Sequence, residues 1–220
     1  LYAYSEHYIL TLGNRDVGSL NEFMAKLPGD EKQKLAQVRE AYSYMMVHPG
    51  CKMMAPGADM PEGLAKCIQA LNALYKSSPA LYQMDDEYDG FEWVQLMKYE
   101  ENVITFFRKT EKPEETLLVI CNFAAVPHEN YQVGVPFAGK YKEIFNSDAA
   151  EFGGEGVVNS RVKTAKAEEC DEREHSIKVK LPALGVSIYS CTPGKAPARK
   201  KVTAAKTAKD KTAKDKTAGK

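Results

Sequence analysis

The chain has 220 residues, 44% of them hydrophobic, and its 30 Lys and Arg balance its 30 Asp and Glu. This length supports a buried core without disulfide staples, but it is too short for a complete (β/α)8 barrel of about 250 residues. No run approaches the ~18 apolar residues of a membrane helix, so we expect no membrane contact. Residues 1–5 lack both an initiator Met and a signal-peptide layout. We therefore expect the sequence to begin inside a longer protein.

The zero net charge is a cancellation between two regions. Residues 195–220 contain ten basic and two acidic side chains, a net +8, which leaves −8 for residues 1–194. An acidic body repels phosphate, so we expect no specific nucleic-acid partner, and a nucleic-acid role rests on the tail alone. The tail repeats Thr-Ala-Lys-Asp-Lys from residues 207 and 212. This low complexity predicts a disordered, solubilising segment over residues 193–220.

The first 85 residues carry the spacing of amphipathic helices. A short helix is predicted over residues 19–27, and Asp30 then offers an N-cap for a longer helix that ends at His48-Pro49-Gly50. A brief apolar run at 51–54 indicates a strand, and residues 64–75 repeat the helical spacing. This order predicts the last βα units of a larger α/β structure. In an isolated piece, we expect the apolar stripes to be partly uncovered.

From Phe91 onward the pattern changes to period two, which is typical of strands. The predicted strands are 91–97, 103–108, 117–123, 131–135, 141–145, 176–181 and 186–191. Short strands separated by turn residues predict an antiparallel sandwich, and the polar segment 163–174 is predicted to be an exposed loop. We therefore expect an incomplete barrel end over 1–85, an all-β sandwich over 86–192 and the tail over 193–220.

The sequence contains few motifs that are typical of catalytic sites. It contains no GxSxG, no phosphate-binding glycine loop before a helix, no HExxH and no zinc-ligand spacing, so we expect neither metal nor cofactor. Gly153–Gly156 is interpreted as a plain loop, and the histidines as structural or solvated. The odd number of cysteines favours reduced thiols and a cytoplasmic location. The cysteines are Cys51, Cys67, Cys121, Cys170 and Cys191.

Acidic and aromatic side chains offer two other routes to chemistry on sugars. Glycoside chemistry needs two carboxylates at a defined separation, but the acidic clusters at 85–87, 114–115 and 168–169 are interpreted as solvated turns. Exposed aromatic rings could stack on sugars, but a core or half-buried place in the sheet is the favoured interpretation. The aromatic residues concerned are Trp93, Tyr99, Tyr131 and Tyr141.

Several segments, in order and with near-family spacing, resemble the C-terminal region of 1,4-α-glucan (glycogen) branching enzymes of the α-amylase superfamily. The segments are 27–30 (LPGD), 44–50 (YMMVHPG), 70–75 (ALNALY), 79–82 (PALY), 90–93 (GFEW), 119–123 (VICNF), 133–136 (VGVP) and 146–154 (NSDAAEFGG). The resemblance implies the end of a catalytic barrel followed by a β-sandwich, acting on α-glucan. It also implies a retaining transfer whose Asp nucleophile and Glu acid/base would precede Leu1, on a barrel portion expected as covalent partner.

The sequence departs from the family at its barrel end. The family's Ser-His-Asp-Glu motif is matched here with Ser5-Glu6-His7-Tyr8, so Glu6 and His7 occupy the place of the His-Asp pair and no catalytic role is carried over to them. The acidic, Gly- and Trp-rich loop expected after Met54 is also short. Two hypotheses follow: a fragment or divergent paralogue of a branching enzyme, or a non-catalytic α-glucan-binding or scaffolding protein derived from that family.

Overall fold

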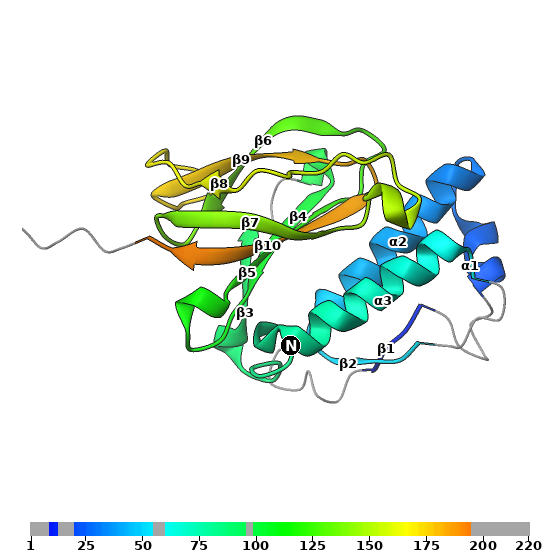
Figure 1. Ribbon diagram of the computed structural model, residues 1–220, viewed down its shortest axis with the longest axis horizontal. Helices are drawn as coiled ribbons and strands as arrows, with labels where there is room; N and C mark the ends of the chain where they lie inside the picture. Colours follow the sequence, from blue (N-terminus) through cyan, green and yellow to red (C-terminus); the bar gives the residue numbers. More distant parts are fainter. Residues whose placement is uncertain (1–8, 13–19, 55–59, 96–98, 195–220) are drawn as a thin grey trace, which may run out of the picture.

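The computed structural model describes residues 9–12, 20–54, 60–95 and 99–194 (Figure 1). Most of the expected tail, residues 195–220, therefore lies outside the described residues, and so does the 5–8 segment. The expected fold class, βα units followed by an antiparallel β-sandwich, is confirmed. The division of the chain at residues 85 and 86 stays a prediction.

Three α-helices form the first part of the structure: α1 (Leu20–Lys26), α2 (Glu31–Val47) and α3 (Glu62–Ser77). The predicted N-cap of α2 is present as a capping box. The Gln33 amide donates to Asp30 Oδ1 at 2.8 Å, and the Asp30 amide donates to Gln33 Oε1 at 3.0 Å. These two bonds satisfy backbone donors that a helix start leaves free.

Two short parallel strands accompany the helices. β1 (Ile9–Leu10) pairs with β2 (Cys51–Lys52), and the Met53 amide donates to the Leu10 carbonyl at 2.8 Å. Parallel strands need a long crossover connection, which here contains α1 and α2. The pair lies on the far side of α3 from β7 and β10 (Figure 1). This is the βα arrangement that the sequence predicted.

The second part is a two-sheet antiparallel sandwich. Its large sheet has the strand order β3-β4-β5-β10-β7-β8, and β6 pairs with β9 in the second sheet. The strands are β3 (Phe91–Gln95), β4 (Val103–Arg108), β5 (Leu117–Asn122), β6 (His128–Val135), β7 (Gly139–Asn146), β8 (Lys163–Thr164), β9 (His175–Leu181) and β10 (Gly185–Pro193). The prediction of loop for residues 163–174 was wrong at its start, because Lys163 and Thr164 pair with Tyr141 and Lys140.

The large sheet is covered on both faces, and β5 shows this most clearly. Leu118 and Ile120 belong to the core between the two sheets, whereas Val119 and Cys121 belong to the core shared with α2 and α3. All six residues of β5 are buried. A strand covered on both faces has no solvent side, and its sequence is therefore a nearly continuous apolar run.

The helical stripes are covered by this sheet, contrary to the expectation that they would be partly bare. Val38 and Met45 of α2, with Leu64 and Leu71 of α3, are buried in the same core as the sheet. Exposed apolar side chains occur instead beside the parallel pair, where Ile9 is 63% exposed and Met53 is 42% exposed. The apolar side chains Ile9 and Met53 beside the parallel pair therefore lack cover within the described residues.

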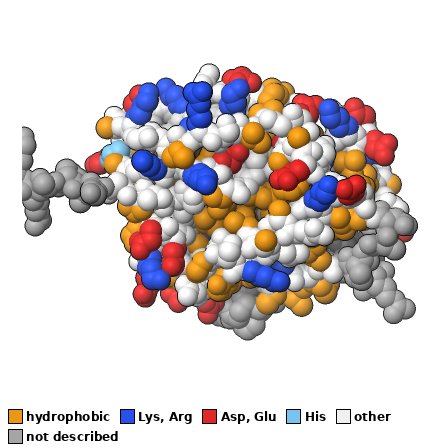
Figure 2. Space-filling view, in the orientation of Figure 1, with side chains coloured by type: hydrophobic (Ala, Val, Ile, Leu, Met, Phe, Trp, Pro, Cys, Tyr) orange, Lys and Arg blue, Asp and Glu red, His pale blue; other side chains and the backbone are white. Residues whose placement is uncertain are grey.

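Basic side chains gather along the upper edge of the view in Figure 2, the side on which Figure 1 places β8 and β9. Lys178 and Lys180 of β9 are exposed and pair with acidic neighbours. Lys178 lies 3.5 Å from Glu168, and Lys180 lies 2.9 Å from Glu129. Because these pairs are exposed, each adds little to stability.

Candidate functional site

In barrels built from parallel strands, catalytic groups come from the carboxyl ends of the strands and the loops that follow. The carboxyl ends of β1 and β2 lead into residues 13–19 and 55–59, which are outside the described residues. Glu6 and His7, which occupy the place of the family's His-Asp pair, are also outside them, and they precede β1 in the chain.

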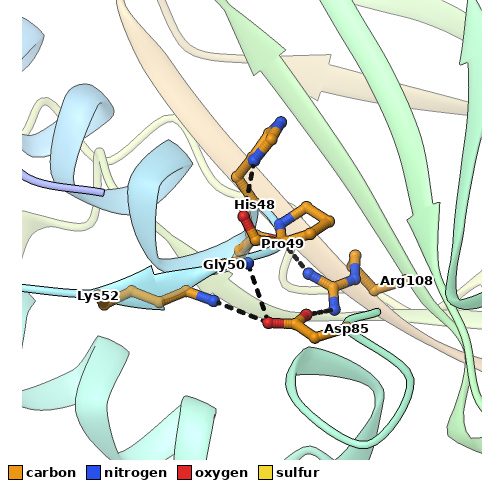
Figure 3. Close-up of polar contacts among 7 residues, drawn as sticks. His48, Pro49, Gly50, Lys52, Asp85 and Arg108 are labelled. Atoms are coloured by element: carbon orange, nitrogen blue, oxygen red, sulfur yellow. Dashed lines mark hydrogen bonds and ion pairs between the residues drawn. The ribbon is translucent and has the colours of Figure 1, made fainter. Parts of the chain in front are cut away.

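A polar cluster joins α2, β2, β4 and the turn after α3 (Figure 3). Asp85 is its centre: Oδ1 accepts from Arg108 Nη2, and Oδ2 accepts from the Gly50 amide at 3.0 Å. Lys52 Nζ lies 3.5 Å from the same Oδ2. Arg108 Nη1 also donates to the Val47 carbonyl at 2.7 Å. One carboxylate therefore holds two cations, from β2 and β4, and a backbone amide from the turn before β2.

Burial governs the electrostatics of this cluster. The Arg108 side chain is 0% exposed, and burial lowers its pKa, while the Asp85 carboxylate opposes that shift. Burial also lowers the pKa of Lys52, whose ammonium lies 5.0 Å from the centre of the Tyr75 ring. The sequence-based interpretation of residues 85–87 as a solvated turn was wrong for Asp85. Its partners lie 23 to 35 residues away in sequence, so no local pattern reveals them.

The cluster is structural rather than catalytic in its placement. It surrounds Gly50, immediately before β2 begins at Cys51, and so lies at the amino end of that strand. Chemistry in this class of fold sits at the opposite ends of the strands. What the arrangement does is fasten the end of α2 and the start of β2 to the sandwich strand β4.

Two histidines, His48 and His128, make packing contacts with neighbouring rings. His48 Nδ1 lies 3.1 Å from the Pro49 carbonyl oxygen, and its ring centroid lies 5.4 Å from that of Tyr44 and 5.8 Å from that of Phe91. Burial lowers the pKa of His48. The His128 ring contacts Tyr131 with centroids 5.5 Å apart. These contacts use the histidine rings for packing.

Gly153–Gly156 is a loop, as predicted, and the amides of Glu155 and Gly156 are directed to Asp148. Asp148 Oδ1 accepts from the Glu155 amide at 2.9 Å, and Oδ2 accepts from the Val157 amide at 3.0 Å. The Gly156 amide donates to the Asp148 carbonyl at 2.8 Å. An internal carboxylate thus occupies the donors that a phosphate loop would offer to a ligand.

A polar network beneath this loop was missed by sequence reasoning. Glu143 accepts from the Asn159 amide at 2.9 Å, from Asn159 Nδ2 at 2.8 Å and from the Tyr189 hydroxyl at 3.1 Å. Burial raises the pKa of Tyr189. The residues of this network come from β7, β10 and the long loop between β7 and β8, and only the folded sheet brings them together. The network anchors that loop to the sheet.

The aromatic residues weighed as sugar platforms behave as sheet residues. Tyr131 and Tyr141 are buried, and Trp93 is half-buried. The Trp93 ring packs edge-on against the Phe91 ring, with the ring centroids 4.8 Å apart. The side chain of Tyr99 is outside the described residues. The interpretation of these residues as parts of the sheet is therefore confirmed for the three that are described.

Within the described ranges, no three His, Cys, Asp or Glu side chains lie together where they could hold a metal ion. Three of the cysteines, Cys67, Cys121 and Cys191, are fully buried thiols. Burial raises the pKa of Cys67 to about 12. None of the helices in the described part of the chain has the length and apolar character to cross a membrane.

Residues 93–192 match the family "Alpha amylase, C-terminal all-beta domain", and the sandwich is therefore a domain of the α-amylase class. The chain also aligns with "1,4-alpha-glucan branching enzyme GlgB" of Oceanobacillus iheyensis, with 36% identity over 211 residues, covering 86% of this chain and 33% of the relative. The same enzyme of Synechococcus elongatus is 34% identical, with coverages of 88% and 28%. Over most of its length the chain is therefore similar to the C-terminal part of 1,4-α-glucan branching enzymes.

The chain spans about a third of the length of these curated relatives. A solved structure of AmyP in complex with maltotriose superposes on 84% of this chain, with a TM-score of 0.53 and 12% sequence identity. At that identity the likeness concerns the fold alone. It agrees with the arrangement described above, in which helices and a parallel strand pair precede a two-sheet sandwich.

Proposed function

We propose that this chain is the C-terminal part of a longer 1,4-α-glucan branching enzyme, or of a divergent paralogue, that acts in glycogen biosynthesis. The observation that carries the proposal is the 36% identity to a branching enzyme across 86% of the chain. The parallel pair β1–β2, with exposed Ile9 and Met53 beside it, supports the proposal, because such a pair is a fragment of a larger sheet.

The proposed reaction moves a glucan chain in two displacements. A carboxylate on the preceding barrel portion attacks the anomeric carbon and breaks an α-1,4 bond, while a carboxylic acid gives its proton to the departing 4-hydroxyl oxygen. A 6-hydroxyl of a second glucan then attacks the glycosyl carbon and loses its proton to the same acid/base group. An α-1,6 bond forms, the nucleophile is released, and no external co-reactant is consumed.

In this proposal the chain's own residues provide support rather than the reacting carboxylates. The Asp85–Arg108 cluster holds the amino end of β2 to the sandwich, and α2 and α3 pack on the large sheet. The carboxyl ends of β1 and β2 would then face the glucan. We propose the cytoplasm as the location, in line with the buried free thiols of Cys67 and Cys121.

Complementation tests the proposal in cells. The complete gene that encodes this chain is expressed in a bacterium that lacks its own branching enzyme, and its α-glucan is stained with iodine. Branching shortens the linear segments that bind iodine, so we expect the stain to change from the blue of linear glucan to the red-brown of glycogen. A blue stain despite abundant full-length protein would contradict the proposal.

A further inference from the structure

A cleft of about 510 Å³ lies at the end of the sandwich where β7 and β9 begin and β10 ends (Figure 1). Three segments line it: residues 135–138 between β6 and β7, residues 172–175 leading into β9, and residues 193–194 at the end of β10. The volume is within the ~300–1,000 Å³ typical of binding sites. The cleft therefore lies where the described chain leads into the basic residues that follow position 194.

Apolar groups form part of this lining. Pro136 is exposed, and Phe137 and Pro193 are half-buried. The Phe137 and Tyr141 rings stack with their centroids 6.0 Å apart, and the Tyr141 hydroxyl donates to the Phe137 carbonyl at 2.7 Å. Phe137 is therefore held in place, while part of its surface remains open to an occupant of the cleft.

Two carboxylates in the lining have no cation beside them. Glu172 and Glu174 are exposed and form no ion pair within the described residues. Arg173, which stands between them in the sequence, is engaged elsewhere: Nη2 donates to Glu92, and Cζ lies 5.1 Å from the centre of the Phe107 ring. The lining therefore presents uncompensated negative charge, which favours a basic occupant.

The turn that carries Glu172 is fixed by its own contacts. Cys170 and Arg173 exchange two backbone hydrogen bonds of 3.0 Å, and the Asp171 carboxylate accepts from the Gly134 amide at 2.9 Å. A Cβ on Gly134 would meet the Cys170 carbonyl oxygen at 2.3 Å, so only glycine lets the turn approach β6 this closely. The fold therefore places Glu172 at the cleft before any occupant arrives.

The end of β10 directs the chain that follows it toward this lining. Pro193 pairs with Gly139, and the Gly194 amide donates to the Ala138 carbonyl at 2.7 Å. In an antiparallel ladder, each next residue lies opposite the preceding residue of the partner strand. One further step of this ladder leads to Phe137. The segment after Gly194 is therefore tethered to the cleft itself.

This segment matches the cleft in charge and composition. Residues 195–201 read Lys-Ala-Pro-Ala-Arg-Lys-Lys, with four basic side chains and no acidic one. Pro197 has little backbone freedom to lose on docking, and its ring suits an apolar neighbour such as Phe137. A short tether gives an effective concentration in the millimolar range, so ion pairs that are individually weak can hold the segment.

We propose that residues 195–201 dock in this cleft of the same molecule. Their basic side chains pair with Glu172 and Glu174, and Pro197 packs on Phe137. The docked segment covers the cleft and withdraws part of the basic charge of the tail from other anions. This contact goes beyond the proposed function and does not depend on it, because it requires neither a barrel nor a glucan.

Limited trypsin digestion of the folded 220-residue chain tests this inference, because trypsin cuts after Lys and Arg in segments that are not held in structure. Mass spectrometry compares cleavage after Arg199 with cleavage after Lys206, and a synthetic peptide of residues 195–212 supplies the intrinsic rates. Relative to the peptide, we expect cleavage after Arg199 to be about fivefold slower than after Lys206 at low salt. We expect about 0.5 M salt to remove the difference by screening.

A pair of double variants identifies the surface that protects the segment. Glu172→Gln with Glu174→Gln removes both carboxylates of the cleft, and we expect it to abolish the protection after Arg199. Glu111→Gln with Glu114→Gln removes two exposed carboxylates outside this cleft and is the matched control. We expect this control to keep the protection of the unmodified chain.

Three outcomes would overturn the docking. Equal relative rates in the folded chain and in the peptide would show that the segment is not held. Equal effects of the two double variants would show a general attraction between the tail and an acidic body. Protection that increases with protein concentration would place the segment on a second copy of the chain. The iodine stain in the complementation test does not depend on any of these results, so the proposed function is decided separately.

Discussion

At the scale of single residues, stability at the helix–sandwich junction depends on charged side chains whose burial the local sequence does not indicate. Asp85 stands in an acidic run, and Arg108 ends an apolar strand. Neither position shows locally that Arg108 becomes fully buried against the end of α2. Breaking a buried ion pair is far more costly than losing an exposed one, because it leaves the partner charge without compensation.

We therefore predict that Asp85→Asn lowers the free energy of unfolding by about 3 kcal/mol. The substitution leaves Arg108 and Lys52 buried without a countercharge. Urea unfolding followed by circular dichroism measures the change. The control is Lys66→Ala, which breaks the exposed Lys66–Glu62 pair on α3 and should leave the midpoint nearly unchanged. Equal effects of the two variants would contradict the account of the junction.

Glu40 is a second residue whose burial the sequence conceals. It lies on α2, is 3% exposed, and its Oε1 has no hydrogen-bond partner within the described chain. Burial raises the pKa of Glu40 to about 9. The thiol of Cys121, on the facing strand β5, interacts electrostatically with this carboxyl group. At neutral pH the folded protein therefore carries Glu40 protonated, whereas the unfolded chain ionises it.

The sign of the resulting pH dependence follows from proton counting. Between pH 5 and 9 the folded state binds a proton on Glu40 that the unfolded state has lost, so stability decreases as pH rises, by up to about 1.4 kcal/mol per pH unit. We predict that Glu40→Gln removes this contribution and flattens the profile. Urea unfolding at each pH provides the measurement. Parallel profiles for the two proteins would exclude a protonated Glu40.

At the scale of elements, the sequence predicted those features that depend on residues close together in the chain. The N-cap at Asp30 and the extent of β4 could be predicted because a cap and a strand's alternation are encoded in neighbouring residues. The short strand β8 could not, because its two residues are polar and exist as a strand only through pairing with β7. The apolar runs predicted β5, but its two-sided burial requires both the helices and the second sheet.

The capping box predicts a measurable contribution of its own. Asp30→Ala removes the acceptor for the Gln33 amide and should lower the free energy of unfolding by about 1 kcal/mol. Asp86→Ala, an acidic-to-alanine change at an exposed turn, is the comparison variant. Thermal unfolding of both variants checks this. A midpoint for Asp30→Ala no lower than that for Asp86→Ala would show that the box does not stabilise α2.

At the scale of the whole molecule, the change from helical spacing to period two near Phe91 predicted the sandwich and the βα region before it. The sequence pattern did not reveal that both parts share one core, in which Met45 and Leu71 pack with Val119 and Ile188. Such long-range contacts have no periodic signature.

We propose that this chain is part of an enzyme that converts α-1,4 into α-1,6 linkages. The most direct measurement is ¹H NMR of amylose incubated with the purified full-length protein. The account predicts that an α-1,6 anomeric signal grows with time at the expense of the α-1,4 signal, without accumulation of reducing ends. A spectrum that stays that of linear amylose, from protein that is folded and complete, would contradict it.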